Sequence, residues 1–139
     1  MSGAISLTLP SLRKAYSEGS DPADIIEQVY ARIEDVADPN IFLCLFSKEQ
    51  VLSDAKALGP YDPDKTLWGV PFVIKDNIDV AGQPTTAACP EFTYVAKDTA
   101  FVVRQLQAAG ALLIGKTNLD QFATGLVGVR PPYGAPKNA

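Results

Sequence analysis

The sequence predicts an α/β fold in which helices cover both faces of a mixed sheet. Helical apolar patterns alternate along the chain with short apolar runs in which hydrophobic and polar residues do not alternate. Such runs are typical of strands that are buried on both faces. Hydrophobic residues make up 47% of the 139 residues and charged residues 20%, close to the composition of a soluble globular domain with a hydrophobic core.

Residues 1–60 are predicted to form an N-terminal helical region. A first helix over 5–18 places Leu9, Leu12 and Tyr16 on one face and ends at Gly19. Ser20 or Asp21 caps a second helix, which ends at residues 38–40. Its core-facing positions follow a three-to-four spacing: Ile25, Ile26, Val29, Ile33 and Val36. A buried strand over 41–46 and a third helix over 48–58, stopped by Gly59, complete the region.

Residues 61–139 are predicted to form the first, incomplete part of an α/β core. A strand begins near Pro71 and runs from Phe72 to Ile74 or Lys75. A loop over 82–90 leads to a helix over 99–109, which Gly110 caps, and then to a strand over 111–114. That helix is expected to bury Val102, Val103 and Leu106. Thr117 or Asn118 would cap a further helix with Asp120 in its first turn, and the tail over 131–136 is irregular.

Charge and motif content exclude several classes of protein. The net charge of -4 and the scattered basic residues argue against nucleic-acid binding. No apolar run reaches the roughly 18 residues of a membrane span, and residues 1–4 do not resemble a secretion signal, so a cytoplasmic protein is expected. No phosphate-binding glycine motif is present, and no cofactor is expected. Cys44 and Cys89 are expected to be free thiols, with Cys44 buried.

The sequence contains no histidine. This excludes a Ser-His-Asp or Cys-His mechanism supplied by this chain, and it removes the commonest metal ligand. No metal site is therefore expected. A general base would have to be Lys, Asp, Glu or Tyr.

Lys75 is the candidate base. It follows an apolar strand directly and would lie near the end of that strand, where α/β sheets place their ligand sites. Burial disfavours the ammonium form of a lysine, and the neutral amine can act as a general base. The alternative is a lysine whose stem is buried while its head reaches water.

The residues after Lys75 are polar. Asp76 and Asn77 can order a turn through side-chain hydrogen bonds to the backbone, or they can hold Lys75 in place. A carboxylate beside Lys75 would favour its ammonium form, so we expect Asp76 to point elsewhere if Lys75 is a base. Thr85, Thr86 and Cys89 can line a cleft, although no histidine is present to activate Cys89 as a nucleophile.

Two segments resemble the amidase-signature family. The first is Gly69-Val70-Pro71-Phe72-Val73-Ile74-Lys75-Asp76-Asn77-Ile78-Asp79-Val80, which is similar to the family's lysine segment. The second comprises Ala109-Gly110-Ala111 and Gly115-Lys116-Thr117-Asn118-Leu119-Asp120-Gln121-Phe122. Within the family, residues 121–134 are most similar to allophanate hydrolases. The resemblance implies the N-terminal portion of an amidase-signature fold.

It also implies a mechanism with a serine nucleophile, a second serine in a cis peptide, and Lys75 as the base that takes a proton through that second serine. The substrate would be allophanate, hydrolysed to ammonia and carbon dioxide in urea degradation. The family's serines are expected shortly after Asn138, whereas the sequence ends at Ala139 and its last serine is Ser53. We therefore expect this chain to supply the lysine, to lack the nucleophile, and to be inactive alone.

Alternative functions remain open. The chain can belong to a generic amidase or to an A-type amidotransferase subunit, or it can be an inactive truncated module for binding or assembly. A sheet that is interrupted at residue 139 would leave unpaired edges and apolar surface. We therefore expect a homo-oligomer or association with the missing C-terminal part.

Overall fold

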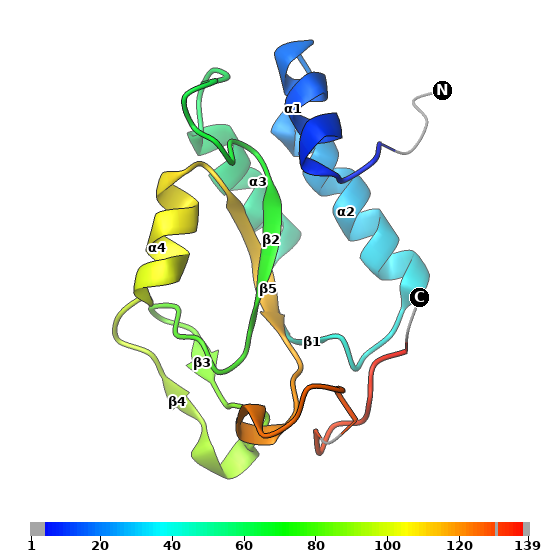
Figure 1. The fold of residues 1–139 in the computed structure, drawn as a ribbon, viewed down its shortest axis with the longest axis vertical. Coiled ribbons are helices and arrows are strands. Elements are labelled where there is room, and N and C mark those ends of the chain that lie inside the picture. Colours follow the sequence, from blue (N-terminus) through cyan, green and yellow to red (C-terminus); the bar gives the residue numbers. More distant parts are fainter. Residues whose placement is uncertain (1–4, 130, 138–139) are drawn as a thin grey trace. The chain divides into compact units, whose positions relative to one another are not determined.

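The computed structural model describes residues 5–129 and 131–137; Met1–Ala4, Arg130 and the last two residues lie outside it. Figure 1 shows its helices, α1 (Leu9–Ser17), α2 (Pro22–Val36), α3 (Lys48–Ala57) and α4 (Phe101–Ala108). The strands are β1 (Phe42–Leu45), β2 (Pro71–Lys75), β3 (Pro84–Thr85), β4 (Tyr94–Val95) and β5 (Leu112–Thr117). Single 3₁₀ turns occur at Pro90–Phe92 and Gln121–Ala123.

Three strands form a mixed sheet in the order β1-β5-β2. β1 is antiparallel to β5, with Phe42 opposite Thr117 and Leu45 opposite Gly115. β2 runs parallel to β5, because Leu112 N donates to Val70 O at one end and Asp76 N donates to Thr117 O at the other. The short strands β3 and β4 pair separately as an antiparallel ribbon. Helices with a mixed sheet confirm the predicted α/β class.

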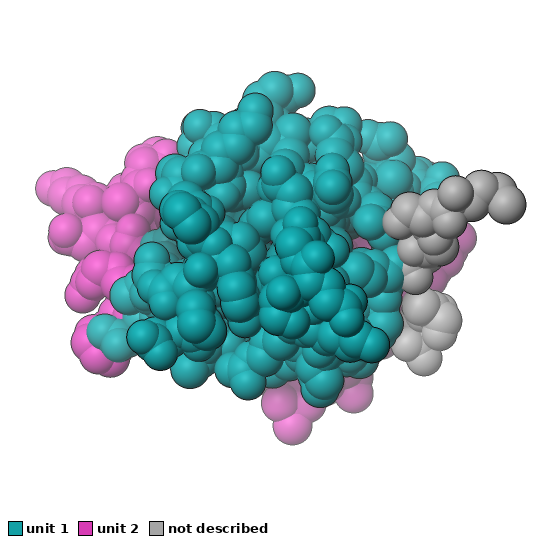
Figure 2. Space-filling model, turned by 90° about the horizontal axis from the view of Figure 1, so that it is seen from above, with its two compact units in different colours: residues 1–36, 46–72, 105–113 teal, residues 37–45, 73–104, 114–139 magenta. Residues whose placement is uncertain are grey.

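The residues divide into two compact units, which Figure 2 shows in different colours. Unit 1 comprises residues 1–36, 46–72 and 105–113, and unit 2 comprises residues 37–45, 73–104 and 114–139. β2 and β5 each contribute their first residues to unit 1 and their last residues to unit 2. The division of the sequence at residue 60 stays a prediction.

The predicted helix ends are largely confirmed, because local chemistry determines them. Asp21 Oδ1 accepts a hydrogen bond from Ala23 N at the start of α2, and Ser47 Oγ accepts one from Gln50 N in the first turn of α3. Gly19, Gly59 and Gly110 follow their helices with positive φ, as stop residues do.

Some predicted core positions are wrong. α1 begins at Leu9 rather than residue 5, since Ile5 N instead donates to the Gln28 side chain. Leu9 is 45% exposed, and Val36, the last residue of α2, is 61% exposed. In α4 only Val103 is buried, while Val102 is 51% exposed and Leu106 is half-buried. β1 is a half-buried edge strand rather than a buried one.

The helix predicted after Thr117 is also wrong. β5 continues through Thr117, and the Asn118 side chain donates to Asn40 O and Gly134 O, so it is engaged in holding loops together. Among the described residues that follow, only a 3₁₀ turn forms, in which Phe122 has a left-handed φ of 51°. Asp120 Oδ2 accepts hydrogen bonds from Val127 N and Gly128 N, closing a loop over 120–128 instead of starting a helix.

Unit 1 has its own aromatic core. Tyr16 packs edge-on against Trp68 at 5.0 Å between ring centroids, and its hydroxyl donates to Gly69 O at 2.7 Å. Burial, with a smaller contribution from Asp21, raises the pKa of Tyr16. Gly110 lies directly against this core, because a Cβ there would come within 2.8 Å of Trp68 Cα. Its φ of +91° also disfavours any side chain.

We expect Gly110→Ala to destabilise the protein more than Gly19→Ala does, by about 1–3 kcal/mol. Both glycines have a φ near +90°, but a Cβ at Gly19 meets nothing within 4 Å. The difference therefore isolates the contact with Trp68, and chemical denaturation of the natural protein measures it. Equal losses in the two variants would contradict the close packing at Gly110.

Candidate functional site

Lys75 ends β2 in unit 2, and its side chain is exposed. Its neighbours Ile74 and Asp76 are 7% and 1% exposed, so the alternation of a strand turns Lys75 away from the interior. Of the two interpretations of Lys75 from sequence, burial is not seen among the described residues, and the alternative of a lysine whose head reaches water is the one that fits. The expectation that Asp76 points elsewhere is confirmed.

The buried lysine of the structure is Lys116 on β5, which is 0% exposed. Its Nζ donates to Pro84 O at 2.6 Å and to Thr85 Oγ1 at 2.9 Å, and it lies 3.0 Å from Asp76 Oδ1. A lysine ammonium has three hydrogens, and here three oxygens surround it. The contact with Asp76 is an ion pair by distance, although its angle lies outside the hydrogen-bond range.

Asp76 is held mainly by Thr86. Asp76 Oδ2 accepts from Thr86 N at 3.0 Å and also from Thr86 Oγ1. Asp76 O accepts from Thr86 N and from Ala87 N. The predicted turn built on the Asp76 side chain is therefore wrong: the carboxylate binds the loop ten residues further along the chain, not its own turn.

The network continues outward through Thr85 and Asp79. Thr85 Oγ1, which accepts from Lys116, donates to Asp79 Oδ1 at 2.7 Å. Tyr94 Oη donates to the same oxygen at 2.7 Å. The hydrogen bonds from Tyr94 and from Thr85 hold the pKa of Asp79 below its usual value, so a carboxylate anion ends the network. Thr85 and Thr86, which were expected to line a cleft, instead bind buried charges.

Neither cysteine is disulfide-bonded. Cys44 is half-buried rather than buried, and its thiol contacts Gln83 Oε1. Burial raises the pKa of the Cys44 thiol, which opposes a nucleophilic role. Cys89 Sγ donates to Glu91 Oε2 at 3.4 Å. These contacts support neither cysteine as a nucleophile.

Lys116 was not among the predicted site residues, although the sequence carries a signal for it. Lys116 follows the apolar run 111–114 almost as directly as Lys75 follows its own strand. The same local pattern produced opposite outcomes: Lys75 lies on the exposed face of β2, whereas the central strand β5 is buried on both faces and buries Lys116. Whether one or both faces of a strand are covered depends on its place in the fold, which is not a local property.

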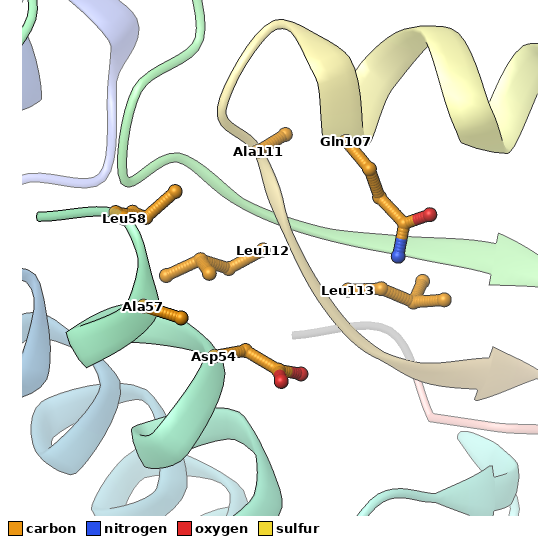
Figure 3. Close-up of a pocket in the computed structure, with 7 residues that line it drawn as sticks. All are labelled: Asp54, Ala57, Leu58, Gln107, Ala111, Leu112 and Leu113. Atoms are coloured by element: carbon orange, nitrogen blue, oxygen red, sulfur yellow. The ribbon is translucent and has the colours of Figure 1, made fainter.

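Unit 1 contains a separate open pocket of about 240 Å³ (Figure 3). Asp54 and Gln107 supply polar groups to its lining, and Leu112 and Leu113 lie between them among its apolar residues. Asp54 Oδ1 already accepts a hydrogen bond from Gln50. The lining residues include no lysine, cysteine or serine, so this pocket is not the candidate catalytic site.

Metal-binding clusters and membrane-spanning helices are both absent from the part of the chain that the structure describes. No group of three or more acidic or cysteine side chains is placed to hold a metal ion there. No helix within these same residues is both long and apolar enough to cross a membrane.

The buried pair Lys116–Asp76 and the exposed Lys75 all lie within the part of the chain that matches a known family. The profile of the amidase family matches residues 24–139. The chain belongs to this family.

Among its relatives, the chain is 54% identical over 97 residues to urea amidolyase of Saccharomyces cerevisiae, a match that covers 68% of this chain and 5% of that protein. It is 38% identical over 130 residues to the A-type subunit of the glutamyl-tRNA(Gln) amidotransferase of Nitratidesulfovibrio vulgaris, covering 90% of this chain and 26% of that protein. The solved structure of Kluyveromyces lactis allophanate hydrolase superimposes with a TM-score of 0.77 at 37% identity, covering 96% of this chain and 22% of that one. The chain thus spans a minor part of these larger proteins.

We expect Lys116→Met to lower the free energy of unfolding by about 3–5 kcal/mol, because it leaves the Asp76 carboxylate buried without its cation. The double variant Lys116→Met/Asp76→Asn should lose less than the sum of the two single variants. Chemical denaturation measures both quantities, and Lys97→Met, at an exposed lysine of the same unit, is the matched control. Simple additivity would show that the two charges do not interact.

Proposed function

We propose that the protein carrying this chain hydrolyses a carbon-nitrogen amide bond, that its substrate is allophanate, and that Lys75 is its general base. The observation that supports this most directly is the 54% identity to urea amidolyase, together with the likeness to an allophanate hydrolase structure. The proposal makes the protein a hydrolase of urea degradation. A cytoplasmic location is part of the same proposal.

The geometry of β2 suits Lys75 to this role. Its amine is exposed at the carboxyl end of a strand, and no described residue forms an ion pair with it, since the nearby carboxylate of Asp76 is engaged by Lys116. A base must be free of a carboxylate partner that would favour its protonated form. The buried pair therefore keeps the Asp76 carboxylate away from Lys75, and covering the exposed amine with the residues that carry the serines would favour its neutral form.

In the proposed reaction, Lys75 takes the proton of a nucleophilic serine through a second serine. The activated serine oxygen attacks the amide carbonyl, and the proton passes to the amide nitrogen, which leaves as ammonia. Water then releases the acyl group from the enzyme as the acid. No serine follows Ser53 in this sequence, so both serines would come from residues outside it. Association of this chain with such residues, or with a second copy of itself, is part of the proposal.

We expect Lys75→Ala to lower kcat for ammonia release from allophanate by at least about 100-fold, the lower range for removal of a general base. The measurement uses the natural protein, with thermal unfolding to show that the variant remains folded. Lys97→Ala removes an exposed lysine from the same unit and should keep full activity. Retention of activity by a folded Lys75→Ala variant would refute the assignment.

A second candidate function is that of an A-type amidotransferase subunit. It is favoured by the match to such a subunit over 90% of this chain. Glutamine hydrolysis separates the two candidates. A protein that releases ammonia from glutamine but not from allophanate belongs to the second class. One that releases ammonia from neither is a generic amidase if it hydrolyses other amides, and an inactive binding or assembly module if it hydrolyses none.

A further inference from the structure

Thr117 on β5 binds the backbone on both sides of Lys75. Its Oγ1 donates to Ile74 O at 3.2 Å, and its carbonyl accepts from Asp76 N at 3.0 Å. One residue of the central strand thus holds the residues immediately before and after Lys75. The hydrogen bond from the Thr117 hydroxyl is additional to the backbone hydrogen bonds that pair β5 with β2.

The neighbouring residue of β5 holds the same strand end from the interior. Lys116 Nζ contacts the Asp76 carboxylate, while Thr86 N and Ala87 N donate to Asp76 O at 3.3 and 3.1 Å. Rotating the peptide groups around Lys75 would break several of these contacts at a buried position. Leaving buried polar groups without partners is costly, so the backbone at Lys75 is firmly held.

We propose that Thr117 and Lys116 are positioning residues for Lys75: they fix the last residues of β2 so that the Lys75 side chain leaves the strand in one direction. This inference rests on the proposed function of Lys75 as a base. A lysine has a flexible four-carbon stem, and the direction of its Cα–Cβ bond decides which region its amine can reach. Catalytic groups depend steeply on such placement, and a displacement of about 1 Å can cost on the order of 100-fold in rate.

Thr117→Val tests this with the smallest change of shape, because it removes the hydroxyl and keeps the branched side chain. We expect kcat for allophanate to fall about 10-fold or more, with KM changed by less than about twofold, since the loss affects the chemical step. Thr117→Ser retains the hydroxyl and should restore most of kcat. A Thr117→Val variant with unaltered kcat would overturn the proposal, as would equal losses in the two variants.

A double variant distinguishes positioning from general damage. In a Lys75→Ala background, Thr117→Val should cause no further loss of kcat, because its effect acts through Lys75. Val103→Ala, which opens a cavity in the core of the same unit, should lower stability and leave kcat of the folded protein unchanged. A further loss in the Lys75→Ala background would show a role unrelated to Lys75.

Lys116→Met provides a second test of the interior contact, with kcat measured at a temperature where the variant is folded. We expect a loss of kcat at constant KM here too, and an unaltered kcat would remove Lys116 from the proposal. Failure of the proposed function is recognised separately. An active Lys75→Ala variant, or an unaltered protein without activity on allophanate, refutes both proposals. An inactive Lys75→Ala variant beside a fully active Thr117→Val variant refutes only the positioning.

Discussion

The buried ion pair between Lys116 and Asp76 is the interaction on which the candidate site depends. Removing two charges from water costs several kcal/mol for each ion, and such a pair is tolerated only when further hydrogen bonds satisfy both groups. Here the remaining partners of Lys116 are Pro84 O and Thr85 Oγ1, and those of Asp76 come from Thr86. The pair therefore requires the loop over 84–86 to fold against the ends of β2 and β5.

This requirement explains why the very short strands β3 and β4 form beside the ion pair. β3 and β4 have two residues each, too few to be stable without other support. Thr85 of β3 binds Lys116 and Asp79, and Tyr94 of β4 binds Asp79 from the other side. Charged hydrogen bonds thus replace the apolar packing that a longer ribbon would have. The site and its scaffold are parts of one polar network.

Features that depend on neighbouring residues could be predicted from the sequence. Capping by Asp21, the glycine stops at Gly19 and Gly110, and the limits of β2 all follow from local backbone chemistry. The family and the α/β class were likewise predictable from short segments. The sequence singled out Lys75 as the candidate base. It did not determine whether the Lys75 side chain is buried, because burial depends on which distant segments cover each face of the strand.

Features that depend on distant residues could not be predicted in this way. Asn118 was a reasonable helix cap by composition, yet it binds Asn40 O, 78 positions earlier in the chain. Leu9 and Val36 fit the apolar spacing of their helices but lie at the helix ends, beyond the reach of the core. The burial of Lys116 follows from the central place of β5 in the sheet, which no local pattern reveals.

The alternation at the end of β2 has a consequence for folding as well. A shift of β2 by one residue would exchange its two faces, and Lys75 would then take the interior place of Asp76, opposite Lys116. Two ammonium groups would meet where the native structure pairs opposite charges, and like charges in a buried site strongly repel. The Lys116–Asp76 pair therefore favours the native register of β2 over the register shifted by one residue. The charge that keeps Lys75 on the outside is the one at position 116.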